Sequence, residues 1–155
     1  MSYTGTKSQS GNQTVVNINN GTVTTPAWTL VGDISSFAQQ GTQNKSDDAT
    51  NLQSTAEEFI PTILTPGKFS VVMARVSGDA GQTAVKASMN AVPPTLVQYQ
   101  VVLPKTASQT TSGDKFVFLA MVEEFLNLGD VKPDKKVMTQ FSLKVSGPIT
   151  ETIGS

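Results

Sequence analysis

The sequence predicts an α+β domain that is mainly antiparallel β, a sandwich or partly open barrel with one flanking helix and long polar loops. Charged residues make up only 15 % of the chain, below the roughly 25 % typical of soluble proteins. Thr, Ser, Gln and Asn take their place, which favours strands and loops over surface helices. About seven short segments have a strand pattern and one has the helical period. The length of 155 residues fits one domain.

The N-terminal part begins with short strands and ends in a long polar stretch. Val15 to Ile18 is followed by Asn19-Asn20-Gly21, which predicts a two-residue hairpin turn with a strand returning over Thr22 to Thr25. Trp28 to Ile34 is predicted as another short strand. Ser35 to Gln53 is polar and is predicted as a long loop, of the kind that is functional or becomes ordered against a partner.

Two central strands are predicted on either side of Thr65-Pro66-Gly67, whose proline and glycine fit a type II turn. Glu57 to Leu64 precedes the turn, and Pro61 within it cannot donate a ladder hydrogen bond, which places that strand at an edge or bulge. Phe69 to Val76 follows the turn. Because an exposed edge can pair with another chain, we expect these strands to form contacts between subunits. The candidate residues are Glu58, Phe59, Ser70, Val72, Ala74 and Arg75.

One helix is predicted over Ala80 to Asn90. Asp79 and Gln82 have the spacing of an N-cap residue and its N3 partner. An apolar stripe that includes Val85 is expected to pack on a sheet, and Pro93-Pro94 ends the segment.

Three strands follow the predicted helix, over Leu96 to Leu103, Lys115 to Phe125 and Lys136 to Ser146. The second is apolar on both sides and should be covered twice. In the third, alternate residues from Val137 to Val145 should face the core. The connection between these two is predicted at Asn127 to Asp134, and Ser146-Gly147-Pro148 should end the last strand. The predicted organisation is a flexible N-terminal arm (1–14), a β domain (15–150) and a C-terminal tail (151–155).

The residues that carry most enzyme chemistry are missing from this sequence. It contains no cysteine and no histidine. Its acidic pairs, Asp47-Asp48, Glu57-Glu58 and Glu123-Glu124, are adjacent residues, which face opposite sides of a strand and rarely converge on one substrate. We therefore expect no enzyme activity, cofactor or metal. The net charge of −1 argues against tight binding of nucleic acid.

No stretch resembles a secretory signal or a membrane-spanning helix. We therefore expect synthesis in the cytoplasm and no membrane insertion by this chain. The single arginine, Arg75, lies among apolar residues. It is expected either to pair with a carboxylate across a subunit interface or to extend out of the sheet.

Several short motifs follow one another in a set order along the chain. They are W-x-L-V-G-D-I from Trp28, D-D-A-T-N-L-Q-S-T-A-E-E-F-I-P from Asp47, P-G-K-F-S from Pro66, G-D-x-G-Q from Gly78 and V-M-T-Q-F-S-L-K-V-S-G-P-I-T from Val137. Each motif is built from common residues, and their order and spacing carry the signal. The series resembles the major tail tube proteins of long-tailed, siphovirus-type bacteriophages, over about residues 28–150.

The resemblance implies a β-sandwich or barrel with a flanking helix, a virion location, and six copies in a ring. Rings stack around the tape measure protein into a tube that carries DNA into the host without sequence-specific binding. Tail terminator and tail tip or baseplate proteins are the other implied partners.

Within such a tube, Gln39 to Thr55 is expected to be flexible in the free subunit and ordered against a neighbouring ring or subunit. The candidate contacts are Gln43, Asn44, Lys45, Asp47, Asp48, Thr50 and Leu52. Ser70, Ala74 and Glu58, which are polar or small, are expected to face the channel in preference to Phe69 or Met73.

Three other functions remain open on the sequence. The inner tube of a contractile tail or related injection apparatus fits the same motifs. A β-rich carbohydrate-binding or adhesin-like module would need an aromatic platform, and the chain offers one Trp and two Tyr. A small hydrolase would have to use the acidic pairs.

Overall fold

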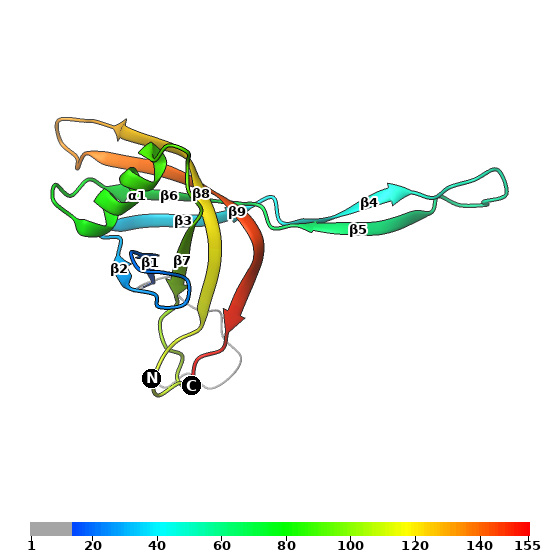
Figure 1. The fold of residues 1–155 in the computed structure, drawn as a ribbon, viewed down its shortest axis with the longest axis horizontal. Coiled ribbons are helices and arrows are strands. Elements are labelled where there is room, and N and C mark those ends of the chain that lie inside the picture. The colour runs from blue at the N-terminus through cyan, green and yellow to red at the C-terminus, as the bar shows by residue number, and fades with distance from the viewer. Residues whose placement is uncertain (1–13) are drawn as a thin grey trace.

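A curved antiparallel sheet with one helix forms the body of the molecule. A separate two-stranded element, called the arm (residues 41–66), extends from it (Figure 1). The computed structural model describes residues 14–155. The main sheet has the order β2-β1-β7-β8-β9-β6-β3. Its strands are β1 (Val15–Asn19), β2 (Trp28–Leu30), β3 (Ile34–Gln40), β6 (Lys68–Ala74), β7 (Val97–Val102), β8 (Lys115–Asp130) and β9 (Met138–Thr152). The sheet is open, and the predicted fold class is confirmed.

The core lies on the inner face of the curved sheet. Alternate residues of β9 are buried as predicted, with Phe141 and Leu143 at 0 % exposure. A row of aromatic rings crosses this core: Phe69 stacks between Phe37 and Phe118, with ring centroids 4.7 and 4.6 Å away. Helix α1 (Ala80–Asn90) has the predicted bounds and adds the buried Val85 to the same core.

The last two strands are longer than predicted. The sequence placed a connection at Asn127 to Asp134 and an end at Ser146-Gly147-Pro148, and both predictions were wrong. β8 and β9 pair with one another from Lys115 to Asp130, and three register shifts absorb the irregular residues. Such bulges keep a ladder continuous through residues that would otherwise break it.

The start of the chain also differs from the prediction. Asn19 pairs with Trp28, so residues 20–27 form a longer connection in place of a two-residue turn with a strand over 22–25. The reason is the side chain of Asn19, which is 7 % exposed. Its Oδ1 accepts hydrogen bonds from the amides of Gly21 (2.7 Å) and Ala27 (2.9 Å), and its Nδ2 donates to the carbonyl of Thr22 (2.9 Å). This side chain organises the longer loop.

The polar stretch Ser35 to Gln53 is not a loop. It contains most of β3 and all of β4 (Gln43–Asp48), which pairs with β5 (Phe59–Thr65). Polar side chains are compatible with these strands because the ladder bonds are made by the backbone and both strands lie at edges. Pro61 lies in β5, and both strands of the two-stranded β4–β5 ribbon are edge strands. The predicted edge position of the Pro61 strand is therefore confirmed.

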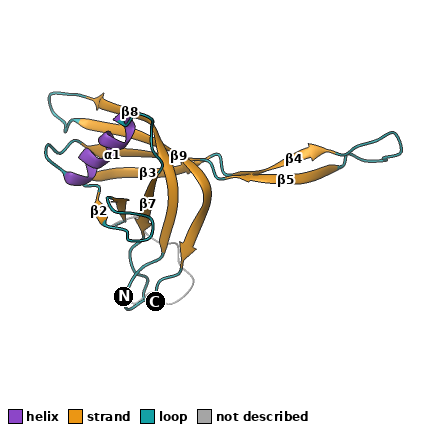
Figure 2. Ribbon diagram, in the orientation of Figure 1, coloured by secondary structure: helices purple, strands orange, loops and turns teal. Residues whose placement is uncertain are grey.

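Thr65-Pro66-Gly67 does not close a hairpin. The chain leaves the arm there and enters β6, which lies between β3 and β9. The predicted positive φ of Gly67 is present, at 86°. However, β6 has no free edge within the subunit, so it is not the edge strand that the sequence suggested. Figure 2 shows that β3–β4 and β5–β6 together form one long, interrupted hairpin.

The structure describes the C-terminal end of the chain in full and the N-terminal end from Thr14. Residues 1–13 of the predicted N-terminal arm lie outside the described residues, and Thr14 is the first residue described. At the other end, β9 continues to Thr152. The carbonyl of Ser155 accepts hydrogen bonds from the amides of Thr110 (2.9 Å) and Thr111 (2.7 Å), which ties the C-terminal residues to the 104–114 loop.

Candidate assembly surfaces

Neither a metal cluster nor a membrane-spanning helix is found in residues 14–155. No group of three or more acidic side chains there could hold a metal ion. No helix in this range is long and apolar enough to span a bilayer. Of the acidic pairs, Glu123 forms an ion pair with Lys68 at 3.4 Å. The features that stand out are surfaces: two free strand edges, a polar sheet face, an apolar cavity and the arm.

One end of the main sheet is a four-stranded layer with two free edges. Among the described strands, β7 pairs with β8 only from Lys115 to Ala120, so residues 121–130 of β8 pair with β9 alone. At the other side of the layer, β3 pairs with β6 alone. The layer therefore runs β8-β9-β6-β3, and its strands alternate in direction. Its two free edges run in opposite directions.

On β3, β6 and β9 the outer face of this layer, opposite the core, carries mainly small and polar side chains, and β8 adds Glu124 together with the apolar Met121 and Leu126. Three cross-strand rows are defined by the register. They are Ser36-Val72-Gln140, Ala38-Ser70-Ser142 and Gln40-Lys68-Lys144. Ser70 and Val72, both candidates from the sequence, lie on this face. Ala74 shares their side of β6 but is 5 % exposed.

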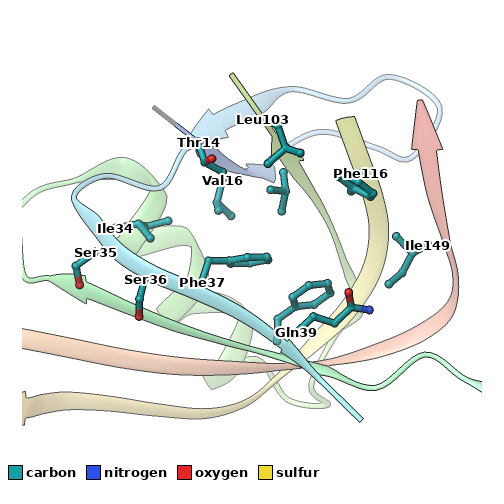
Figure 3. Close-up of a pocket in the computed structure, with 12 residues that line it drawn as sticks. Thr14, Val16, Ile34, Ser35, Ser36, Phe37, Gln39, Leu103, Phe116 and Ile149 are labelled. Carbon is teal, nitrogen blue, oxygen red and sulfur yellow. The ribbon is translucent and has the colours of Figure 1, made fainter. Parts of the chain in front are cut away.

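An apolar cavity of about 570 Å³ lies where the curved sheet fails to close. Figure 3 shows Ile34 and Phe37 of β3 on one side, and Val16, Leu103 and Phe116 on the other. Its lining within residues 14–155 contains no charged side chain. The cavity is therefore the unclosed seam of a partial barrel, with the properties of a core and no group suited to acid–base chemistry.

The arm exposes large apolar side chains on both faces. Phe59 and Ile63 are 69 % and 68 % exposed, and the other members of the set are Leu52, Ile60 and Leu64. β4 and β5 pair only with one another. Because an isolated two-stranded ribbon is marginally stable in water, and exposed apolar patches mark interaction sites, this arm is the strongest candidate for a contact with another chain.

The arm is also acidic. Residues 41–66 contain four carboxylates, at Asp47, Asp48, Glu57 and Glu58, and the single cation Lys45. The backbone amide and the hydroxyl of Thr50 lower the pKa of Asp48 by hydrogen bonding to its carboxylate. Asp47 Oδ1 accepts from the amide of Asp48 at 3.0 Å. The aspartates are thus engaged locally, while the two glutamates have no such hydrogen bond within the described chain.

The structure brings most of the sequence candidates together on this arm. The residues on β4 are Gln43, Asn44, Lys45, Asp47 and Asp48, and those in the tip are Thr50 and Leu52. Phe59 begins β5, and Glu58 directly precedes it. Ile60, Ile63 and Leu64 were not among the sequence candidates. Their segment was predicted only as a strand, because a strand prediction does not reveal that both faces lack cover.

Comparisons with known proteins support the fold. No family model and no curated protein matches the chain. The SPP1 tail tube protein is similar, with 16 % identity and a TM-score of 0.68, over 96 % of this chain and 80 % of that chain. The anti-feeding prophage (AFP) tube-terminating cap gives 8 % identity and a TM-score of 0.71, over 99 % and 97 %. The tail of an empty gene transfer agent (GTA) particle gives 11 % and 0.68, over 94 % and 99 %. The chain therefore has the fold seen in tail tube and tube-terminating proteins.

Proposed function

We propose that this chain is a structural subunit of a phage tail tube, with no enzyme activity. In this proposal six copies form a ring, and rings stack around a tape measure protein into the conduit through which DNA enters the host. Terminator and tail tip or baseplate proteins close the two ends of the tube. The observation that carries the proposal is the four-stranded layer with two free edges of opposite direction.

The two edges are suited to closing a ring. If β3 of one copy lies beside residues 121–130 of β8 in the next, the new pair is antiparallel, because the layer has an even number of alternating strands. Each closure satisfies the unpaired N–H and C=O groups of both edges. It also removes the edges on which unwanted pairing would occur.

The outer face of the layer is suited to line a channel. Its serines, glutamines and alanine carry no positive charge that would hold DNA phosphates. Of the two lysines in the rows, Lys68 is neutralised in part by Glu123 at 3.4 Å, and Lys144 is the remaining cation. Because DNA affinity grows with the number of phosphates that cations neutralise, a wall with few free cations lets DNA slide. Ser70 and Val72 would face the lumen in this arrangement.

The arm would then join one ring to the next. A contact there covers Phe59 and the other apolar residues that the free subunit exposes. It also explains why an isolated ribbon persists in the fold, since ribbons of this kind need a partner for stability.

A second candidate function is the inner tube, or its terminating cap, in a contractile injection apparatus. It is favoured by the similarity to the AFP cap, which extends over 99 % of this chain. The carbohydrate-binding alternative loses support because Tyr99 is buried at 0 % exposure and cannot form part of a surface platform.

Electron microscopy and sedimentation of the purified chain test the proposal. We expect six-fold rings and tubes in the parent protein. In Leu128→Lys, whose side chain is 67 % exposed next to the free β8 edge, the fraction in rings should fall about tenfold, because lysine disfavours edge pairing. Val23→Lys, also exposed at 63 % but in the 20–27 connection, is the matched control. A parent protein that stays monomeric would contradict the proposal that this chain forms a tube. If Leu128→Lys forms as many rings as the parent, the proposal that β8 supplies the ring-closing edge would be contradicted.

A further inference from the structure

The end of the body opposite the arm carries a small cationic hollow. Its volume is about 140 Å³, and its lining includes Arg75 after β6, Lys86 on α1 and Phe125 on β8. None of the lining residues that the structure describes carries a carboxylate. In the part of the chain that the structure describes, neither the Arg75 guanidinium nor the Lys86 ammonium has a hydrogen bond or ion pair. Two cations thus face one hollow without a counter-charge.

Neighbouring carboxylates are already engaged elsewhere. Asp33 lies 3.8 Å from Lys136, and Asp130 lies 3.7 Å from Lys132. Asp79 caps α1, where its Oδ2 accepts from the amides of Gln82 (3.0 Å) and Gly32 (3.2 Å). None of the ion pairs in residues 14–155 involves Arg75 or Lys86, so both cations are available to an anion from outside the subunit.

The hollow is held in shape by the side chain of Gln82, which is 7 % exposed. Its Oε1 accepts from the amide of Val76 at 3.1 Å, and its Nε2 donates to the carbonyls of Ala74 and Gly32, both at 2.9 Å. These bonds fix the backbone on both sides of Arg75 against the start of α1. A site fixed in this way loses less entropy when it binds a partner.

The arm has the complementary chemistry. Glu57 and Glu58 carry carboxylates without a side-chain hydrogen bond in the described chain, and Phe59 beside them is 69 % exposed. Figure 1 shows the arm at one end of the molecule and α1 at the other, so the arm cannot reach the hollow of its own subunit. Two complementary surfaces at opposite ends of one subunit can form a head-to-tail contact between copies. Such a contact extends into an open stack when it does not close a ring.

We infer that Glu57 and Glu58 on the arm of one copy bind Arg75 and Lys86 of a copy in the next ring. Arginine and a carboxylate can form two parallel hydrogen bonds. Such a pair fixes the relative orientation of the two groups in addition to the attraction between their charges. Phe59 would pack over Val76, which is 41 % exposed at the rim. This inference rests on the proposed function, since it names the acceptor surface for the arm in a stack of rings.

Cysteine cross-linking tests the contact directly, because the natural sequence contains no cysteine. Glu58→Cys and Lys86→Cys are prepared as separate proteins, mixed, allowed to assemble and oxidised. We expect disulfide-linked dimers in the mixture and none in either protein alone. Dimers of Glu58→Cys alone would show that arms meet arms and would overturn the inference. Tubes that form in the mixture without any cross-link would overturn it as well.

Charge reversal provides an independent test. Arg75→Glu combined with Lys86→Glu should leave rings intact and reduce stacked rings about tenfold. Adding Glu57→Lys and Glu58→Lys to the same chain should restore stacking. Lys105→Glu, in the 104–114 loop, is a control for a reversed surface cation. Unchanged stacking in the reversed pair would contradict the inference while leaving the tube proposal standing. A parent that forms neither rings nor tubes would contradict the tube proposal itself.

Discussion

Replacing Gln82 by alanine should strongly destabilise the subunit. The change removes the partners of three backbone groups, the N–H of Val76 and the carbonyls of Gly32 and Ala74. An unsatisfied buried polar group costs about 1–3 kcal/mol. Water can reach part of the space left by the side chain, so the low end of that range applies to each group. The expected loss is about 3–4 kcal/mol in the free energy of unfolding.

Urea unfolding followed by the fluorescence of Trp28, the only tryptophan, measures this loss. The matched control is Gln39→Ala, an exposed glutamine whose side chain donates one hydrogen bond, to Thr42 Oγ1 at 2.7 Å. The control should change stability by less than about 0.5 kcal/mol. A loss below about 1 kcal/mol for Gln82→Ala would refute the reasoning, because it would mean that the three backbone groups find other partners.

Three further predictions follow from the structure. Gly67→Ala should lower stability by about 1–3 kcal/mol more than Gly78→Ala in urea unfolding; both have positive φ, but only at Gly67 would a Cβ meet the carbonyl oxygen of Gln40. Amide hydrogens of residues 43–65 should exchange rapidly with solvent in the monomer and slowly in the tube. Equal exchange in the two states would contradict the proposal that the arm contacts a neighbouring ring. Burial raises the pKa of Tyr99, against a smaller opposing effect of the Ser88 hydroxyl. As the pH rises, the unfolded chain therefore loses the Tyr99 proton before the folded chain does. Above about pH 10, the free energy of unfolding of the parent should fall with pH, and its slope should be steeper than that of Tyr99→Phe by about 1.4 kcal/mol per pH unit.

The elements that the sequence predicted well are those with signals inside a single segment. The helix has both an N-cap at Asp79 and an apolar stripe through Val85, and its bounds agree with the structure. The alternation around Phe141 likewise identified the buried face of β9. Such signals depend on local hydrogen bonds and on burial of one face, so they can be read without knowing what lies across the sheet.

Pairing partners were harder to predict, because they depend on residues far apart in the sequence. The positive φ of Gly67 was correctly expected, yet the strands on either side of it pair with different partners. The polar residues of β3 and β4 gave no apolar alternation, so these two strands were interpreted as a loop, whereas β5 was predicted as a strand. For the same reason, the edge strands were predicted at β5 and β6. β5 does lie at an edge, but in the main sheet the free edges belong to β3 and the distal half of β8.

The candidate contact residues could be located only in part. The acidic and polar positions of the arm stood out by composition, and the structure places them on one projecting element. The Arg75–Lys86 hollow could not be read from the sequence, because it joins the end of β6 to α1 through the side chain of Gln82. Arg75 was singled out as an unusual residue without its neighbours being known.

The junction between arm and body has a mechanical consequence. Gly41 and Gly67 lie side by side there, both with positive φ, at 74° and 86°. Sheets resist bending because their ladders must deform together, whereas a joint without side chains can change its angle at little cost. In a long stack of copies, flexure would concentrate at this joint, once per subunit. These two glycines would then be the place where the angle between arm and body adjusts when rings bend against one another.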